Sequence, residues 1–198
     1  MTRPERIRNK LIDEFGLWLL IKEDYACHFR DWTRPGFRAM TVYRFGTWAR
    51  GLESFLFMAI FYSVYLRLQR YIRNSYGIEI SAKSKIGRRL HIGHQNGIVV
   101  HEYATIGDDC RILQGATLGA GADFSQDTAP VLGNRVEVGP GAMIIGKVKI
   151  GDDVRIGPNA VFMHDVPANT SVIAPPSRFL PRPAVGKPQD EAPKSAVV

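Results

Sequence analysis

Residues 132–157 read LGNRVE VGPGAM IIGKVK IGDDVR IG, and each block of six opens with leucine, valine or isoleucine. This period runs through most of the second half of the chain, at Ile80, Ile86, Ile92, Val100, Ile106, Ile112, Leu118, Leu132, Val138, Ile144, Ile150, Ile156 and Phe162. A period of six matches neither an α-helical turn nor the alternation of an ordinary strand. It matches one flat side of a triangular solenoid, so three hexapeptides make one coil of a parallel β-helix.

Three segments follow from this pattern. Residues 1–76 are predicted to be an α-helical region, because the runs 5–30 and 36–75 contain few Gly or Pro and place apolar residues three to four apart. Residues 77–179 are predicted to form the β-helix domain. Residues 180–198 are rich in proline and charge, which predicts a disordered tail.

The net charge of +7 is concentrated in the helical region. Residues 1–75 hold 13 Lys and Arg against 7 Asp and Glu, whereas residues 76–198 hold 13 against 12. This excess indicates either a solvated helical surface or attraction to an anionic membrane face or acidic substrate. No recognition motif accompanies it, so nucleic acid is not expected as a partner.

The apolar run 55–66 is shorter than the roughly 18–20 residues that cross a bilayer. A buried helix is expected there, with shallow interfacial contact as the alternative. Cys110 occupies an inward position of the repeats and is expected to be a buried, reduced thiol. With only one other cysteine and a charged N-terminus, the chain is predicted to be cytoplasmic, with the inner face of the membrane as a second option.

The period of six is interrupted twice. Ile92 and Val100 are eight residues apart, and Leu118 and Leu132 are fourteen apart, so residues 121–128 loop out. Loops on a rigid scaffold are where sites are usually built. The first interruption contains His94. We expect both interruptions to lie near one edge of the solenoid.

Several stretches resemble the catalytic domain of serine acetyltransferases. They are residues 77–100 (GIEISAKSKIGRRLHIGHQNGIVV), 112–119, 148–161 and 173–178, and the helical stretch 36–48 is similar too. The resemblance covers roughly residues 20–180. It implies a mainly β fold, a left-handed parallel β-helix with an N-terminal α-helical region. It also implies a homotrimer, with a dimer of trimers as a further option, and acetyl transfer from acetyl-CoA to a hydroxyl.

The resemblance assigns His94 as general base and Glu79 as the carboxylate that orients it. An imidazole can take the proton of a hydroxyl as that hydroxyl attacks a thioester, and a carboxylate behind the ring stabilises the imidazolium. Backbone amides near Gly119–Gly121 would stabilise the oxyanion. The residues carried over for acetyl-CoA binding are Ala120, Gly121, Pro140, Gly141, Arg155, Pro158, Ala174, Pro175 and Arg178.

Three departures from the serine acetyltransferase pattern concern the acceptor. The second interruption lacks an Arg-His pair before proline and reads Asp127-Thr128-Ala129-Pro130, and Gly93 replaces an Asp before His94. The acidic segment before the helical stretch 36–48 is also cut short, because Asp31 is followed at once by Trp-Thr-Arg-Pro. A site without its polar anchors should lose its substrate by orders of magnitude. The pattern is more similar to acetyltransferases of exopolysaccharide clusters, which predicts a saccharide or lipid-linked saccharide acceptor. Serine O-acetylation in cysteine biosynthesis and a non-catalytic scaffold are the alternatives.

Two further histidines lie near His94. His91 and His101 have no counterpart in serine acetyltransferases, and exposed coil positions are expected, with substrate contact as the alternative. Three histidines also suggest a metal site of the kind found in γ-class carbonic anhydrases, which share the fold. The spacing of His91, His94 and His101 does not match that family, so no metal is expected.

Overall fold

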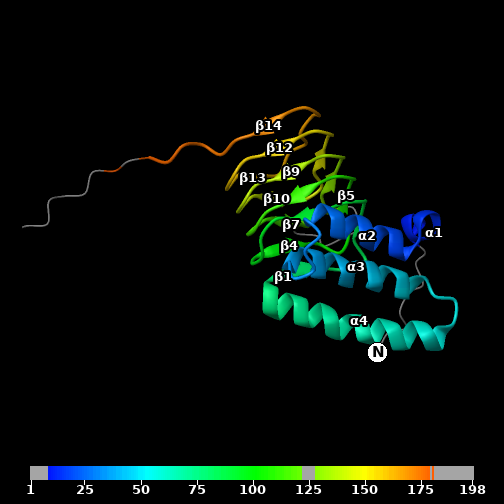
Figure 1. The fold of residues 1–198 in the computed structure, drawn as a ribbon. Coiled ribbons are helices and arrows are strands. Elements are labelled where there is room, and N and C mark those ends of the chain that lie inside the picture. Colours follow the sequence, from blue (N-terminus) through cyan, green and yellow to red (C-terminus); the bar gives the residue numbers. More distant parts are fainter. Residues whose placement is uncertain (1–8, 122–127, 179, 181–198) are drawn as a thin grey trace, which may run out of the picture.

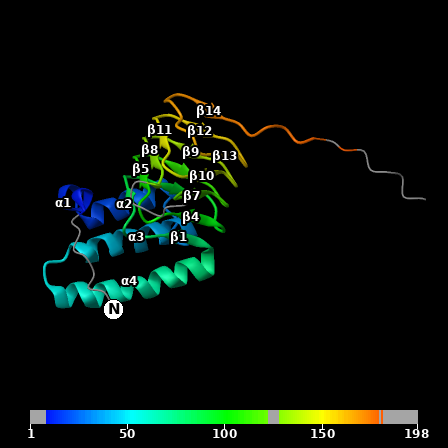
Figure 2. The same ribbon diagram turned by 180° about the vertical axis from the view of Figure 1, so that it is seen from behind.

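The computed structural model describes residues 9–121, 128–178 and 180, in which four helices precede a three-sided solenoid (Figures 1 and 2). The fold class expected from the hexapeptides is confirmed: a left-handed parallel β-helix with an N-terminal helical region. Apart from Leu180, the predicted tail 180–198 lies outside the described residues.

The helices are α1 (Lys10–Phe15), α2 (Leu17–Cys27), α3 (Pro35–Gly51) and α4 (Phe55–Tyr76). The sequence predicted two helices, over 5–30 and 36–75, whereas the described residues form four, so that prediction is wrong. Gly16, with φ of +78°, ends α1 and starts α2, because an L side chain rarely adopts this backbone conformation. Extended backbone at Leu52 and Ser54 separates α3 from α4.

Three parallel sheets form the sides of the solenoid. Sheet A contains β1 (Ile78–Ile80), β4 (Ile98–Val100), β7 (Thr117–Gly119), β10 (Met143–Ile145) and β13 (Val161–Phe162). Sheet B contains β2 (Lys85–Ile86), β5 (Thr105–Ile106), β8 (Val131–Leu132) and β11 (Lys149–Ile150). Sheet C contains β3 (His91–Ile92), β6 (Arg111–Ile112), β9 (Glu137–Val138), β12 (Arg155–Ile156) and β14 (Ser171–Val172).

The residues at every sixth position form the core of the solenoid. Each stacks on the residue one coil away, as Ile86, Ile106 and Leu132 do in sheet B. All thirteen predicted positions are buried except Phe162, which lies near the far end of the stack and is half-buried. Cys110 is buried and unpaired, as expected. Burying one such aliphatic side chain is worth about 1.5–3 kcal/mol, so the ladder dominates the stability of this domain.

The helical region closes the first coil of the solenoid. The hydroxyl of Tyr43 in α3 donates to Ser84 O (2.9 Å) and accepts from Ile86 N (3.0 Å). The hydroxyl of Tyr65 in α4 accepts from Ala82 N (2.8 Å). These bonds satisfy backbone groups that have no preceding coil to pair with. In both views α4 lies at the end of the molecule opposite β14 (Figures 1 and 2).

The apolar run 55–66 forms the first half of α4 but is not the buried helix that was expected. Met58 and Tyr65 are buried, whereas Phe55, Leu56 and Phe57 are about half exposed or more. The run packs through one face only, because α3 and the first coil cover only one side of α4. No helix in the described part of the chain combines the length and apolarity that a membrane span requires.

Candidate active site

His94 lies in the first interruption, in the turn from β3 to β4, and its side chain is exposed. The turn crosses the edge between sheets C and A, here called the C–A edge. Asn96 and Gly97 adopt positive φ in this turn, and Asn96 N donates to Tyr76 O (2.9 Å) at the end of α4. The interruption is therefore an ordered turn held against the helical region.

The strand before His94 is held by the buried side chain of His28. His28 Nε2 accepts from the backbone N–H of Ile92 (3.1 Å), so the proton is on Nδ1, which donates to Asp24 O (2.6 Å). Burial lowers the pKa of His28, which favours this neutral form. Gly36 packs on the same point: a Cβ there would lie 2.8 Å from Ile92 Cβ and 2.9 Å from His28 Nε2. The entry of α3 is thus fitted closely against β3.

A pocket of about 420 Å³ opens beside His94. It is lined by Asp31, Thr33, Arg34, Pro35 and Gly36 from the turn between α2 and α3, and by Ile92, Gly93, His94 and Gln95. The fold therefore brings a carboxylate and a guanidinium from the helical region to the predicted catalytic histidine. Sequence reasoning took Asp31 as the end of a shortened acidic segment and assigned neither residue to the site, because nothing in the sequence shows that this turn lies beside His94.

Asp31 and Arg34 form an ion pair with each other, and Asp31 also accepts hydrogen bonds from Thr33. Asp31 Oδ1 accepts from Thr33 N (2.9 Å) and Thr33 Oγ1 (2.6 Å), and these bonds lower the pKa of Asp31, so the carboxylate is ionised at neutral pH. Asp31 Oδ2 lies 3.6 Å from Arg34 Nε, too far for a hydrogen bond. Arg34 Nε is buried without a hydrogen-bond partner among the described residues, and the guanidinium lies 4.9 Å from the centre of the Phe29 ring.

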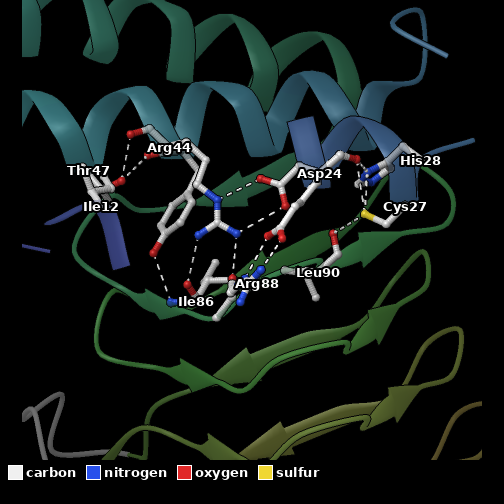
Figure 3. A network of polar contacts seen from close by, with 12 residues as sticks. Ile12, Asp24, Cys27, His28, Arg44, Thr47, Ile86, Arg88 and Leu90 are labelled. Atoms are coloured by element: carbon white, nitrogen blue, oxygen red, sulfur yellow. Dashed lines mark hydrogen bonds and ion pairs between the residues drawn. The ribbon is translucent and has the colours of Figure 1, made fainter. Parts of the chain in front are cut away.

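A buried ion pair lies behind this site and joins the helices to the first coil (Figure 3). Arg44 Nε donates to Asp24 Oδ2 (2.8 Å), and the other guanidinium nitrogens donate to Ile86 O (3.1 Å) and Gly87 O (2.6 Å). Arg88 forms a second ion pair with Glu23 of α2. Because the backbone O of Asp24 also accepts from His28, one network connects the ion pair to the strand that precedes His94.

His91 and His101 occupy different surroundings. His91 is half-buried rather than exposed, with its ring centre 5.1 Å from that of His28 and 5.4 Å from that of Phe29. Burial lowers the pKa of His91 to about 4, so the ring is neutral at neutral pH. His101 is also half-buried rather than exposed, and lies in the turn after β4, where its Nδ1 accepts from Tyr103 N (3.3 Å).

Glu79 lies at the centre of β1, opposite Val99 of β4, with its side chain exposed on the outer face of sheet A. Neither the Glu79 carboxylate nor the His94 imidazole has a hydrogen bond to another described residue. Their pairing as carboxylate and base therefore stays a prediction.

The two interruptions do not share an edge, so that expectation is wrong. The first lies at the C–A edge, whereas the second follows β7 and lies at the edge between sheets A and B, here called the A–B edge. At its base Gly121 N donates to Thr128 O (3.1 Å), so this amide is not free to stabilise an oxyanion. Residues 122–127, including Asp127, lie outside the described residues.

The predicted acetyl-CoA residues are divided between the same two edges. Pro140, Gly141 and Pro158 lie in turns of the C–A edge, and Ala174, Pro175 and Arg178 follow β14 there; Ala120 and Gly121 lie at the A–B edge. Arg155 points outward from sheet C beside a groove of about 310 Å³, which is also lined by Arg111, Leu113, Glu137 and Ile173. Within the described ranges, no group of three or more His, Cys, Asp or Glu could hold a metal ion.

Comparisons with known proteins agree with this geometry. The family profile for bacterial transferase hexapeptide (six repeats) matches residues 129–164, which places the solenoid among the hexapeptide-repeat transferases. The chain is 42% identical over 139 residues to a serine acetyltransferase of Helicobacter pylori, a match that covers 70% of this chain and 77% of the relative. It therefore belongs to the serine acetyltransferase family and is an acyltransferase; acetyl-CoA is the acyl donor of that family.

Two more distant matches point the same way. The serine acetyltransferase of Salmonella typhimurium is 36% identical over 155 residues, covering 77% of this chain and 54% of the relative. The structure of serine acetyltransferase isoform 3 from Entamoeba histolytica, in complex with cysteine, has a TM-score of 0.68 and 25% identity. That match covers 87% of this chain and 64% of the other.

These findings overturn the predicted saccharide acceptor and the predicted closeness to exopolysaccharide acetyltransferases. The reported relatives and structure are serine acetyltransferases. The prediction failed because it took the missing Arg-His pair, Gly93 and the shortened acidic segment at Asp31 as the loss of the acceptor anchors. The fold supplies another carboxylate and guanidinium, Asp31 and Arg34, beside His94.

Proposed function

We propose that this protein transfers the acetyl group of acetyl-CoA to the hydroxyl of L-serine, and that the pocket beside His94 holds the amino acid. One observation carries the proposal: this pocket combines an imidazole, a carboxylate and a guanidinium. These groups complement the hydroxyl, the ammonium and the carboxylate of serine. The relatives named serine acetyltransferases support the same acceptor.

His94 is the proposed general base. Its imidazole takes the serine hydroxyl proton as the oxygen bonds to the thioester carbonyl carbon, and the tetrahedral intermediate then collapses with cleavage of the carbon–sulfur bond. The imidazolium returns the proton to the departing thiolate, so the products are O-acetylserine and CoA. Glu79 would orient the ring and stabilise its charged form. No net proton is gained or lost by the protein.

Asp31 and Arg34 are the proposed acceptor anchors. Asp31 stays ionised because Thr33 donates two hydrogen bonds to it, and one of its oxygens remains available to an ammonium group. Arg34 lines the same pocket, and its guanidinium is the proposed partner of the serine carboxylate. Charge-assisted bonds of this kind are about twice as strong as neutral ones, and they fix the direction in which the hydroxyl points.

The donor site is proposed to form between subunits of a homotrimer. Pro140, Gly141 and Pro158 lie at the C–A edge, whereas Ala120 and Gly121 lie at the A–B edge of the same chain. One CoA molecule can contact both sets together only where the edge of one subunit meets the other edge of its neighbour. Arg155 and Arg178 are the proposed phosphate contacts. Pro140 and Pro158 have no N–H, so amide donation falls to their neighbours.

The first test is release of CoA from acetyl-CoA with L-serine as acceptor. His94→Asn should lower kcat by about 10²- to 10⁴-fold, the usual contribution of a general base. His164→Asn, an exposed histidine near the far end of the solenoid, is the matched control and should leave kcat unchanged. Turnover of the His94 variant at the wild-type rate would contradict the assignment.

The second test concerns the acceptor. Asp31→Asn and Arg34→Gln should each raise the KM for L-serine by about tenfold or more, with little change in the KM for acetyl-CoA. Asp153→Asn and Arg135→Gln remove the same charges from an exposed pair on the solenoid and should change neither constant. Absence of serine-dependent CoA release from active protein, shown by turnover of another hydroxyl acceptor, would overturn the proposal.

A further inference from the structure

The outer face of α4 carries an apolar stripe. Its members are Phe57, Ile60, Val64, Leu68 and Tyr71, which are between 38% and 56% exposed. Their spacing of three, four, four and three residues places them along one side of the helix. They form a continuous apolar surface rather than the scattered exposed residues that are normal on a soluble protein.

The stripe cannot turn inward, because another face of α4 is anchored. Met58, Tyr65 and Ile72 recur every seven residues and are buried. The hydroxyl of Tyr65 is bonded to Ala82 N, and the Tyr65 ring lies where a side chain at Gly46 of α3 would be. α4 is the outermost helix at its end of the molecule (Figures 1 and 2), and the exposure of the stripe residues shows that the other described residues leave them partly uncovered.

All charged side chains of α4 are positive. The helix contains Arg67, Arg70 and Arg73 and no Asp or Glu. All three arginines are exposed, and none forms an ion pair with another described residue. Arg67 follows Val64 by three residues and precedes Tyr71 by four, so its side chain borders the stripe, and Arg70 is its neighbour three residues further on. An apolar stripe with a cationic border and no carboxylate is typical of a helix that lies in a membrane interface.

We propose that α4 docks on a membrane surface that contains anionic lipid. The stripe would enter the boundary between headgroups and acyl chains, and the arginines would contact lipid phosphates. A second copy of α4 fits this surface less well. It would bring the arginines of two helices to one contact without a carboxylate from either helix to pair with them. The proposal is independent of the acceptor of the acetyl group.

Sedimentation of the full-length protein with vesicles tests the proposal. Phosphatidylcholine vesicles with phosphatidylglycerol should bind the protein, pure phosphatidylcholine vesicles should bind it weakly, and added salt should reduce binding. The double change Ile60→Ser and Leu68→Ser should reduce binding by about tenfold or more. The double change Arg67→Gln and Arg70→Gln should remove most of the salt dependence.

The matched control changes two exposed apolar residues at the other end of the solenoid, Val161→Ser and Met163→Ser, and should bind like the wild type. Circular dichroism and CoA release should be unchanged in every variant, which separates lost docking from lost folding. Absence of binding to anionic vesicles, or equal binding to neutral ones, would overturn the proposal. So would a fall in oligomeric mass in the Ile60→Ser and Leu68→Ser variant without a loss of vesicle binding, because the stripe would then pair copies of the chain.

Discussion

The solenoid and the helical region both bury apolar side chains, but only the helical region buries charged ones. In the described part of the solenoid the buried residues are apolar apart from Ser84. The helical region buries Asp24, His28, Arg44, Thr47 and Arg50, while Trp18 is 81% exposed and Trp32 is 64% exposed. The solenoid is held by repetition of a single apolar contact, whereas the helical region adds a small set of specific polar bonds to its own apolar contacts.

This difference indicates that the solenoid is the scaffold and that the helical region supplies the features specific to this protein. Each coil contacts only its neighbours, so the stability of the solenoid is approximately a sum of similar terms. The helical region instead supplies His28, Asp31 and Arg34 near His94, and the stripe on α4. We infer that the solenoid provides the acyltransfer framework, whereas acceptor choice and location depend on the helical region.

The largest expected effect comes from the buried ion pair. Arg44→Leu leaves Asp24 buried without its partner and should lower the free energy of unfolding by about 3–5 kcal/mol. Arg135→Gln removes one partner of the exposed Arg135–Asp153 pair on the solenoid and should leave the free energy of unfolding nearly unchanged. Urea unfolding monitored by circular dichroism measures both. Similar costs would remove the distinction between the two regions.

Gly36→Ala should affect catalysis more than stability. The added Cβ would push α3 away from Ile92 and His28, and a shift of about 1 Å near a reacting group can cost 10²-fold in rate. We expect kcat to fall by about tenfold or more. The control, Gly157→Ala in the solenoid, places its Cβ no closer than 3.1 Å to another atom and should keep kcat near the wild-type value. An active Gly36→Ala enzyme would show that the entry of α3 is not fitted to the site.

A smaller effect is expected from pH. Burial holds the pKa of His91 at about 4, below its usual value near 6.5. Between these values the unfolded chain binds a proton that the folded chain does not. The contribution of His91 to the free energy of unfolding should therefore be complete above pH about 6.5 and should decline as the pH falls toward 4.

His91→Phe should reduce this slope, measured as the urea midpoint at successive pH values. The slope should not vanish, because burial lowers the pKa of His28 in the same direction. Exposed His164 provides the control, and His164→Phe should leave the slope as it is in the wild type. An unchanged slope in His91→Phe would contradict burial of this ring.

The smallest difference between the two regions is expected in the reactivity of their cysteine thiols, Cys27 and Cys110, since burial affects both in the same way. Burial raises the pKa of Cys27 to about 12 and that of Cys110 to about 11. Since the thiolate is the reactive form, neither side chain should react with a thiol reagent at pH about 8 until the chain unfolds. Rapid labelling of Cys27 alone would show that α2 opens from the solenoid in the native state.

Sequence reasoning succeeded where the constraint is local and repeated. Twelve of the thirteen predicted core positions are buried, because any residue of that period must face the axis of the solenoid. It failed at the helix boundaries around Gly16 and at the shared edge expected for the two interruptions. Both depend on where the chain goes in space, which a local period does not encode. His94 was located by the interruption that contains it, while its pairing with Glu79 stays a prediction.

The sequence by itself therefore determined the solenoid, the register of its core and the position of His94, because six-residue repetition permits a single way of stacking. Only the tertiary structure decided what surrounds His94. Asp31 and Arg34 are about sixty residues away from it along the chain, and no periodic pattern connects them. They reach the site because Asp24, His28 and Gly36 fit the helices onto the first coil, and this fit depends on the three-dimensional shapes of both regions.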